Sequence, residues 1–309
     1  MNKKSICCLA GAVLFICGLV LLLAVPGPQA VGDGDAAGSA VSVARGTDLL
    51  GFLLLAAGAV AGLMFTKAPV IAWRELSAFF LSPIAYILMG AYLIVVSLIF
   101  NYSVLGSMRA HLEPLFGSIT WLTLFLCPLI TMRLLSEEAR SGTLETMLTV
   151  PVTDVEITIG KFLGALAFYV AMQVPTLVFV YVVARQGSPD YGMIFAGYLG
   201  VVLLGSLLIS IGLFISSFTK NQVIAAFLSI VAIFVLFIIG GLGRLVSADF
   251  PLFGLTINIG KIIEYADASV HYMDFTKGLV MSQHVLYYIS LVVFFLFLTV
   301  RMVESHKWR

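Results

Sequence analysis

The charged side chains that could form specific contacts gather in one segment, residues 133–161, which joins two long apolar stretches (RLLSEEARSGTLETMLTVPVTDVEITIGK). The carboxylates of this segment are Glu137, Glu138, Glu145, Asp154 and Glu156. Leu144, Met147 and Leu148 recur at helical spacing on one face, and Glu145 lies on another. A short amphipathic helix of this kind suits a docking element for a soluble partner. A solvated loop with ordinary charges is the alternative, and the spacing supports both equally.

Local signals divide this segment into separate helices. Gly142 can break the first helix, Thr143 stands at the start of the short helix, and Pro151 ends it. Thr153 is followed three residues later by Glu156, which is a capping box and predicts the start of the next helix. The pattern therefore predicts a helix, a break, a short amphipathic helix, a stop and a capped helix.

The chain carries no nucleotide-binding or hydrolytic motif. It has no G-x-x-x-x-G-K-[ST] loop, and Gly160-Lys161 is not part of one. It also has no H-E-x-x-H and no G-x-S-x-G, so an integral membrane enzyme is disfavoured. We expect ATP hydrolysis to take place in a partner chain, with Glu138, Arg140 and Glu145 seating the short helix on that partner through charge pairs.

Few polar residues lie inside the apolar stretches. Asn101 and Gln173 could mark a transport pathway. Hydrogen bonding between helices is the favoured interpretation for them and for Thr120, Thr123 and the Ser206/Ser210 pair.

A second group of candidates lies between the last two apolar stretches. It comprises His271, Met273, Met281 and His284, which could bind a soft metal. Their spacing matches no ligand motif, so we expect scattered loop residues and predict no metal and no cofactor in this chain.

Membrane-spanning helices must position all of these residues. Of 309 residues, 61% are hydrophobic and only 11% are charged, against about 25% charged in a typical soluble domain. The mean hydropathy is +1.10. This composition excludes an ordinary soluble domain, a disordered chain and a secreted disulfide scaffold. A net charge of +1 gives no support to nucleic-acid binding.

Eight apolar runs are long enough to cross a bilayer as helices. They lie at approximately 6–25, 48–66, 83–104, 117–135, 161–183, 192–217, 223–244 and 285–303. The sequence therefore predicts an all-α polytopic membrane protein. The first run imitates a signal peptide, but its length favours an uncleaved helix.

The distribution of basic residues predicts the orientation. With the N-terminus in the cytoplasm, 11 of the 17 Lys and Arg residues fall on the inner side, and an even number of spans returns the C-terminus to the same side. A surface helix is expected within 67–82, with aromatic residues at the membrane interface and charged residues in water. These residues are Trp73, Phe79 and Phe80, and Lys67, Arg74 and Glu75, respectively. Short helices are expected in 245–284, and a flexible outer loop in 26–46.

The stretch SEEARSGTLETMLTVPVTDVEITIGKFLG resembles the signature of ABC-2 type transporter permeases. The matching residues are Glu137, Glu138, Gly142, Thr143, Leu144, Glu145, Pro151, Val152, Gly160 and Lys161. The stretch 271–309 and the opening WRELSAFFLSPIAYI resemble the gliding-motility-associated subgroup. The pieces shared in 271–309 are Phe275, Lys277-Gly278, Tyr287-Tyr288, Ser290, the run 295–299 and the basic tail. The resemblance covers roughly 70–309.

The resemblance implies a six-helix permease domain at 67–309, preceded by two extra helices at 1–66. It implies a partner ATP-binding subunit that holds ATP and Mg, and a second permease copy or paralogue. The coupling helix would lie at about 143–150 and the outer helices at 245–284. The implied ATPase-coupling residues are Glu137, Glu138, Arg140, Gly142, Thr143, Leu144, Glu145, Met147 and Pro151. Those of the interfacial connecting helix are Trp73, Arg74, Glu75 and Phe79.

The expected function is that of a permease subunit of an ATP-driven exporter in the bacterial cytoplasmic (inner) membrane. The alternative is a mechanical subunit of an ATPase-driven surface or gliding-type machine that carries no solute.

Overall fold

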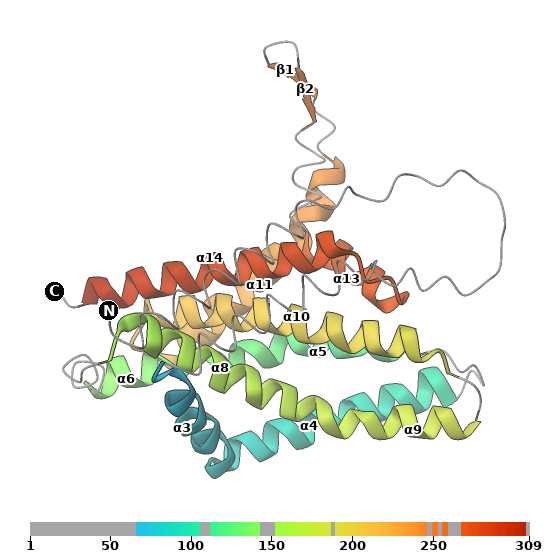
Figure 1. Cartoon of the computed structure of the whole chain (residues 1–309), viewed down its shortest axis with the longest axis horizontal. Coiled ribbons are helices and arrows are strands. Elements are labelled where there is room, and N and C mark those ends of the chain that lie inside the picture. The colour runs from blue at the N-terminus through green and yellow to red at the C-terminus, as the bar shows by residue number, and fades with distance from the viewer. Residues whose placement is uncertain are drawn as a thin grey trace, which may run out of the picture.

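The computed structural model describes residues 66–105, 112–142, 152–186, 189–245, 249–252, 255–258 and 267–306. Long helices run side by side and form one elongated bundle (Figure 1). The predicted spans at 6–25 and 48–66, apart from residue 66, lie outside the described residues. The same holds for the loop 26–46 and for the coupling helix at 143–150.

Six helices of the described part are long and apolar enough to cross a membrane, which confirms the last six predicted spans. They are built on α4 (Pro83–Phe100), α5 (Glu113–Thr131), α8 (Asp154–Gln173), α10 (Tyr191–Ser216), α11 (Gln222–Leu245) and α14 (Ser282–His306). Between α8 and the short helix α9 (Leu177–Gln186) the chain forms one 3-10 turn at Pro175, where proline cannot donate a backbone hydrogen bond. The chain is an all-α polytopic membrane protein.

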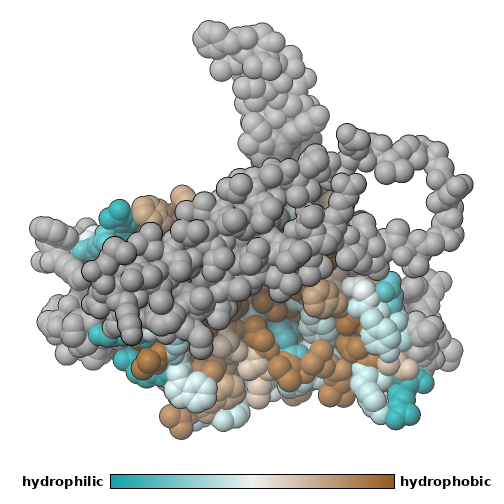
Figure 2. Space-filling model, in the orientation of Figure 1, coloured by the Kyte–Doolittle hydropathy of each residue, from teal (hydrophilic) through white to brown (hydrophobic). Residues whose placement is uncertain are grey.

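The helix α10 forms the centre of the bundle and packs against α5, α8, α11 and α14. A side chain at Gly205 would collide with the ring of Tyr169, so glycine lets α8 approach α10 closely. In contrast, α4, α11 and α14 expose large apolar side chains, among them Ile87, Phe227 and Val293. Figure 2 shows hydrophobic side chains gathered on the described surface. Apolar side chains directed outward are what a lipid-facing surface requires.

The two ends of the bundle differ in what they carry (Figure 1). One end, called the α6 end below, holds α3 (Ala68–Leu81), α6 (Ser136–Ser141) and the end of α14. The opposite end, called the α13 end, holds α13 (Ala268–Thr276) and the end of α9.

The segment 245–284 is only partly as predicted. It contains the helix α13, but also two antiparallel strands, β1 (Asp249–Leu252) and β2 (Leu255–Asn258). Phe250 pairs with Ile257 in this ribbon. The strands were missed because a short apolar run cannot be assigned to helix or strand from its periodicity alone.

Candidate functional site at the coupling end

The helix α3 lies across the start of α8 in a groove made by two glycines. A Cβ atom at Gly160 would lie 2.7 Å from the Cβ of Ile71, and one at Gly164 would lie 2.6 Å from the Cβ of Glu75. Both distances are too short for any real side chain. The small-residue pattern at 160–164 therefore brings the surface helix into backbone contact with a membrane-spanning helix.

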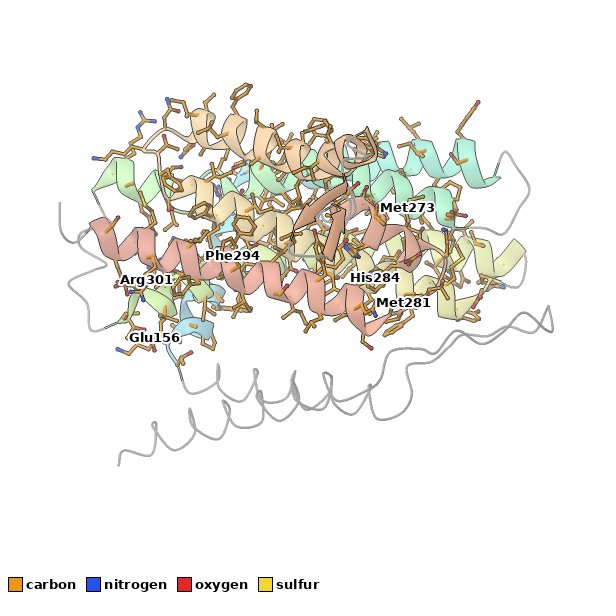
Figure 3. The ribbon with its side chains drawn as sticks, turned by 90° about the horizontal axis from the view of Figure 1, so that it is seen from above. Glu156, Met273, Met281, His284, Phe294 and Arg301 are labelled. Atoms are coloured by element: carbon orange, nitrogen blue, oxygen red, sulfur yellow. The ribbon has the colours of Figure 1, made fainter. Side chains whose placement is uncertain are left out.

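The predicted capping box at the start of α8 is confirmed. The Thr153 amide donates to Glu156 Oε2 at 2.9 Å, and the Glu156 amide donates to Thr153 Oγ1 at 3.2 Å. The other carboxylate oxygen of Glu156 accepts a hydrogen bond from the amide of Lys67 at 3.0 Å. One side chain therefore caps α8 and ties the residue before α3 to it. Figure 3 shows Glu156 near the same end of the bundle as Arg301.

Four charged side chains from three helices form a network that we call the coupling hub: Arg74, Glu75, Glu138 and Lys161. Lys161 is only 1% exposed, and its Nζ donates to Glu75 Oε1 at 3.0 Å and to Glu138 Oε1 at 2.7 Å. Arg74 Nη2 lies 3.0 Å from Glu75 Oε1 and 3.7 Å from Glu138 Oε1. The hub therefore joins α3, α6 and α8 through a single buried ammonium group.

The hub is electrically balanced, with two cations facing two carboxylates. Burial raises the pKa of the Glu75 carboxyl, but the charge of Lys161 and hydrogen bonds from Arg74 and Lys161 together lower it by more. The pKa of Glu75 therefore lies below its ordinary value, and Glu75 is ionised near neutral pH. Buried charges of this kind are tolerated only when they are paired, so removing one member leaves another uncompensated.

The helix α6 is fixed to the bundle on a second side. Ser216 Oγ of α10 accepts hydrogen bonds from the amides of Leu135 and Ser136, at 3.2 Å and 3.1 Å. The helix then ends at Gly142, whose φ of +73° is left-handed, a conformation that favours glycine. This confirms the predicted break. The chain continues from here into 143–151, which lies outside the described residues.

The predicted coupling residues divide into three groups. Glu138 belongs to the hub, whereas Glu137 and Arg140 are exposed on α6. Gly142 is the helix break. The remaining residues lie outside the described part of the chain: Thr143, Leu144, Glu145, Met147 and Pro151.

A helix is confirmed within 67–82, where α3 runs from Ala68 to Leu81, and two of its residues lie differently from the prediction. Trp73 is exposed, as expected. Phe79 is buried instead of lying at the interface, and its ring stacks on Phe168 at 4.7 Å. Glu75 faces Lys161 instead of water. The reason is that this face of α3 packs against Gly160 and Gly164 of α8. There the buried ammonium of Lys161 pairs with the Glu75 carboxylate.

The candidate pathway residues lie in different surroundings. Gln173 is 4% exposed, and its Oε1 accepts a hydrogen bond from the Tyr92 hydroxyl at 2.5 Å. This contact joins α8 to α4 and agrees with a structural role. Thr123 and Tyr169 likewise share a hydrogen bond of 3.1 Å between α5 and α8. Asn101 is exposed.

The two histidines expected to be scattered are in fact in contact. Nδ1 of His271 lies 2.7 Å from Nδ1 of His284, and His284 Nε2 lies 2.8 Å from Asp274 Oδ2 without hydrogen-bond geometry. Met273 and Met281 are exposed, at 56% and 38%; both are labelled with His284 in Figure 3. Among the described residues, no three His, Cys, Asp or Glu side chains form a metal-binding group.

Comparison with known proteins agrees with this architecture. A family model described as ABC-2 family transporter protein matches residues 100–303, which are 204 of the 309 residues. No curated protein matched the chain. The match supports the ABC-2 family in general and does not support the narrower gliding-motility-associated subgroup. Members of this family are transport components of the membrane that work with an ATP-binding subunit. The chain belongs to the ABC-2 family and is a multi-pass transmembrane permease of an ABC transporter.

Proposed function

We propose that a separate ATP-binding subunit docks on residues 136–156 and drives export by moving this segment. The observation that carries the proposal is the hub, because it connects α6, the described start of this segment, to α3 and α8 through ion pairs. Glu138 on α6 and Lys161 on α8 lie 2.7 Å apart, and Glu75 lies on α3. A displacement of α6 would therefore move α3 and α8 with it, since packed elements shift as rigid bodies.

The movement would reach two spans at once. Lys161 belongs to α8 directly. The helix α3 is followed by α4 with only Ser82 between them, and Pro83 opens α4. A shift of α3 and α8 would therefore tilt α4 and α8 together. In this proposal ATP and Mg bind to the partner, and this chain supplies the mechanical path.

The surrounding assembly is part of the proposal. We infer a second permease copy or paralogue, a bacterial cytoplasmic membrane, and a cytoplasmic α6 end with both termini on that side. The positive-inside bias of the sequence supports this orientation. Export is the direction that the family resemblance favours.

Charge reversal tests the docking of the partner, and charge neutralisation inside the hub tests the transmission of its movement. Arg140→Glu and Glu145→Lys should weaken capture of the ATP-binding subunit that copurifies with the full chain, because Arg140 is exposed on α6 and can reach a partner. Glu138→Gln should leave capture intact but reduce substrate-stimulated ATP hydrolysis, because Glu138 faces Lys161 inside the hub.

The matched control is Glu304→Lys, which reverses a partly exposed charge near the end of α14, at the same end of the bundle. Capture and stimulated hydrolysis should both stay at the wild-type level in this variant. If the Arg140, Glu145 and Glu138 variants all behave like this control, the proposal is wrong.

A further inference from the structure

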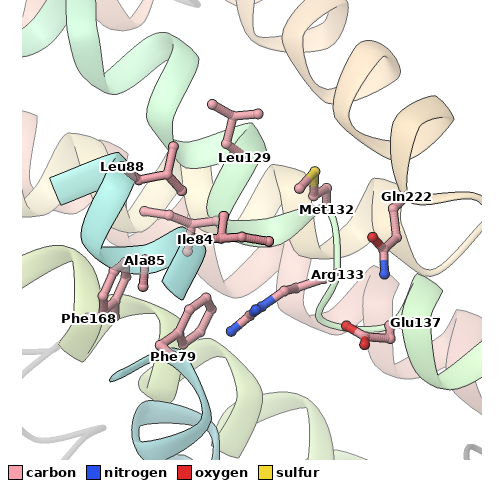
Figure 4. A pocket seen from close by; sticks show the side chains of 11 residues that line it. Phe79, Ile84, Ala85, Leu88, Leu129, Met132, Arg133, Glu137, Phe168 and Gln222 are labelled. Atoms are coloured by element: carbon pink, nitrogen blue, oxygen red, sulfur yellow. The ribbon is translucent and has the colours of Figure 1, made fainter. Parts of the chain in front are cut away.

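A cavity of about 130 Å³ opens at the α6 end, between the starts of α4 and α11 and the end of α5 (Figure 4). Part of its wall is apolar and includes Ile84, Leu88 and Leu129. Three polar side chains complete the lining, namely Arg133, Glu137 and Gln222. None of these three belongs to the coupling hub.

In the described part of the chain, the guanidinium of Arg133 is held in place by an aromatic ring and not by a counter-charge. It lies 4.4 Å from the centre of the Phe79 ring, which in turn stacks on Phe168 at 4.7 Å. Among the described residues, no carboxylate lies within ion-pair distance of it. The two rings therefore fix the position of a cation whose N–H donors remain available to a ligand.

Glu137 follows Arg133 by four residues, the separation at which opposite charges often pair along a helix. The two side chains do not form an ion pair here, and Glu137 has no other ion-pair partner in the part of the chain that the structure describes. They line the same cavity instead (Figure 4). One cavity thus presents a cation, an anion and an amide beside an apolar wall.

The cavity also lies where three of the candidate membrane spans begin or end. The helix α4 begins at Pro83, α5 ends at Thr131, and α11 begins at Gln222, so three membrane-spanning helices end beside it. Ile84 is 55% exposed, and Leu81, at the end of α3, is 83% exposed. In an apolar bundle such side chains face acyl chains.

We propose that this cavity binds a zwitterionic phospholipid whose headgroup carries both a phosphate and a primary ammonium. The phosphate would be held by the Arg133 guanidinium and the side-chain amide of Gln222. A guanidinium can donate two parallel hydrogen bonds to two phosphate oxygens. The ammonium would lie at Glu137, and one acyl chain would lie along Ile84, Leu88 and Leu129. The two unpaired and opposite charges distinguish this ligand from a purely anionic lipid.

The test is native mass spectrometry of the full chain released from micelles that contain phosphatidylethanolamine, phosphatidylcholine and phosphatidylglycerol in equal amounts. Retention of phosphatidylethanolamine should exceed that of the other two. Arg133→Gln should lower this retention by about tenfold, because it removes a charge-assisted hydrogen bond. Glu137→Gln should remove the preference over phosphatidylglycerol.

The matched control is Arg301→Gln. Arg301 lies at the same end of the bundle and 5.1 Å over the Phe297 ring, but it pairs with Glu304 and lines no part of this cavity. Its replacement should leave lipid retention unchanged. Leu88→Trp fills the cavity with all charges kept and should abolish retention, which keeps the test valid if Arg133→Gln fails to fold.

Three results would overturn the proposal. Equal retention of the three lipids would show that no headgroup is selected. A preference for phosphatidylglycerol would show an anion site without the ammonium contact. Equal loss in Arg133→Gln and Arg301→Gln would show that the cavity is not where the lipid binds.

Discussion

Replacing Lys161 tests whether the hub is a single electrostatic unit. Its Nζ lies 2.7 Å from Glu138 Oε1 and 3.0 Å from Glu75 Oε1. At an effective dielectric constant of about 20, the shorter contact corresponds to roughly 6 kcal/mol of attraction before desolvation is subtracted. Lys161→Met would remove this attraction and leave two neighbouring carboxylates with one cation between them, the half-exposed Arg74. We expect it to lower the free energy of unfolding by about 3–5 kcal/mol.

A double-mutant cycle isolates the pairwise contribution. Glu138→Gln alone should cost about 1–3 kcal/mol, because the remaining charges lose a partner. In Lys161→Met the carboxylate of Glu138 is already unbalanced, so neutralising it there should relieve repulsion. The coupling energy should therefore reach about 2–3 kcal/mol, at the upper end of what contacting pairs show.

The control cycle uses Arg301 and Glu304 in α14. Their N–O distance is 2.9 Å, close to that of the buried pair, but their side chains are 63% and 39% exposed. Solvent screening should limit their coupling to about 0.2–1 kcal/mol. Both cycles are measured by equilibrium unfolding of the full chain in mixed micelles, followed by tryptophan fluorescence. Equal coupling energies for the two pairs would refute the claim that burial makes the hub a unit.

Three further predictions follow from the same end of the bundle. Gly164→Ala should destabilise the chain by about 1–3 kcal/mol, because its new Cβ would lie 2.6 Å from the Cβ of Glu75. The control is Gly117→Ala, whose Cβ would meet nothing within 4 Å. It should be neutral or slightly stabilising in the same unfolding measurement. Thr153→Ala should cost about 1 kcal/mol through loss of the cap, and Thr153→Ser should retain it; equal losses would contradict the capping role. The native pKa of Glu75 lies below the ordinary value of 4.5, so its stabilising contribution is fully present above about pH 4.5 and is lost as the pH falls through the native pKa. Glu75→Gln should therefore flatten the pH dependence of unfolding below about pH 4.5, and an unchanged profile would show that Glu75 is not held as a carboxylate by the hub.

Much of this architecture could be predicted from local sequence. Six spans follow from apolar runs of sufficient length, because lipid requires each run to satisfy its own backbone hydrogen bonds. The Thr153–Glu156 cap and the break at Gly142 depend on neighbouring residues alone, and the structure shows both. Local patterns are reliable here because the chemistry that produces them is also local.

The hub could not be predicted in this way. Lys161 is separated from Glu75 by 86 residues and from Glu138 by 23, and no periodicity links residues so far apart. The burial of Phe79 and the contact between His271 and His284 depend on how helices pack. The local pattern that bears on the hub is Gly160-Lys161, since the glycine leaves room for α3 and the lysine binds Glu75 of that helix.

Photo-crosslinking from position 144 tests the central claim most directly. A photoreactive amino acid would replace Leu144 in the full chain within its native membrane, and a matched one would replace Tyr102, which is 86% exposed and lies beyond α4 at the far side of the bundle from α3. A crosslink from position 144 to an ATP-binding subunit, with none from position 102, is the result we predict. A crosslink to that subunit from position 102 alone, or from neither position while the complex is intact, would contradict the proposed docking of the ATPase on residues 136–156.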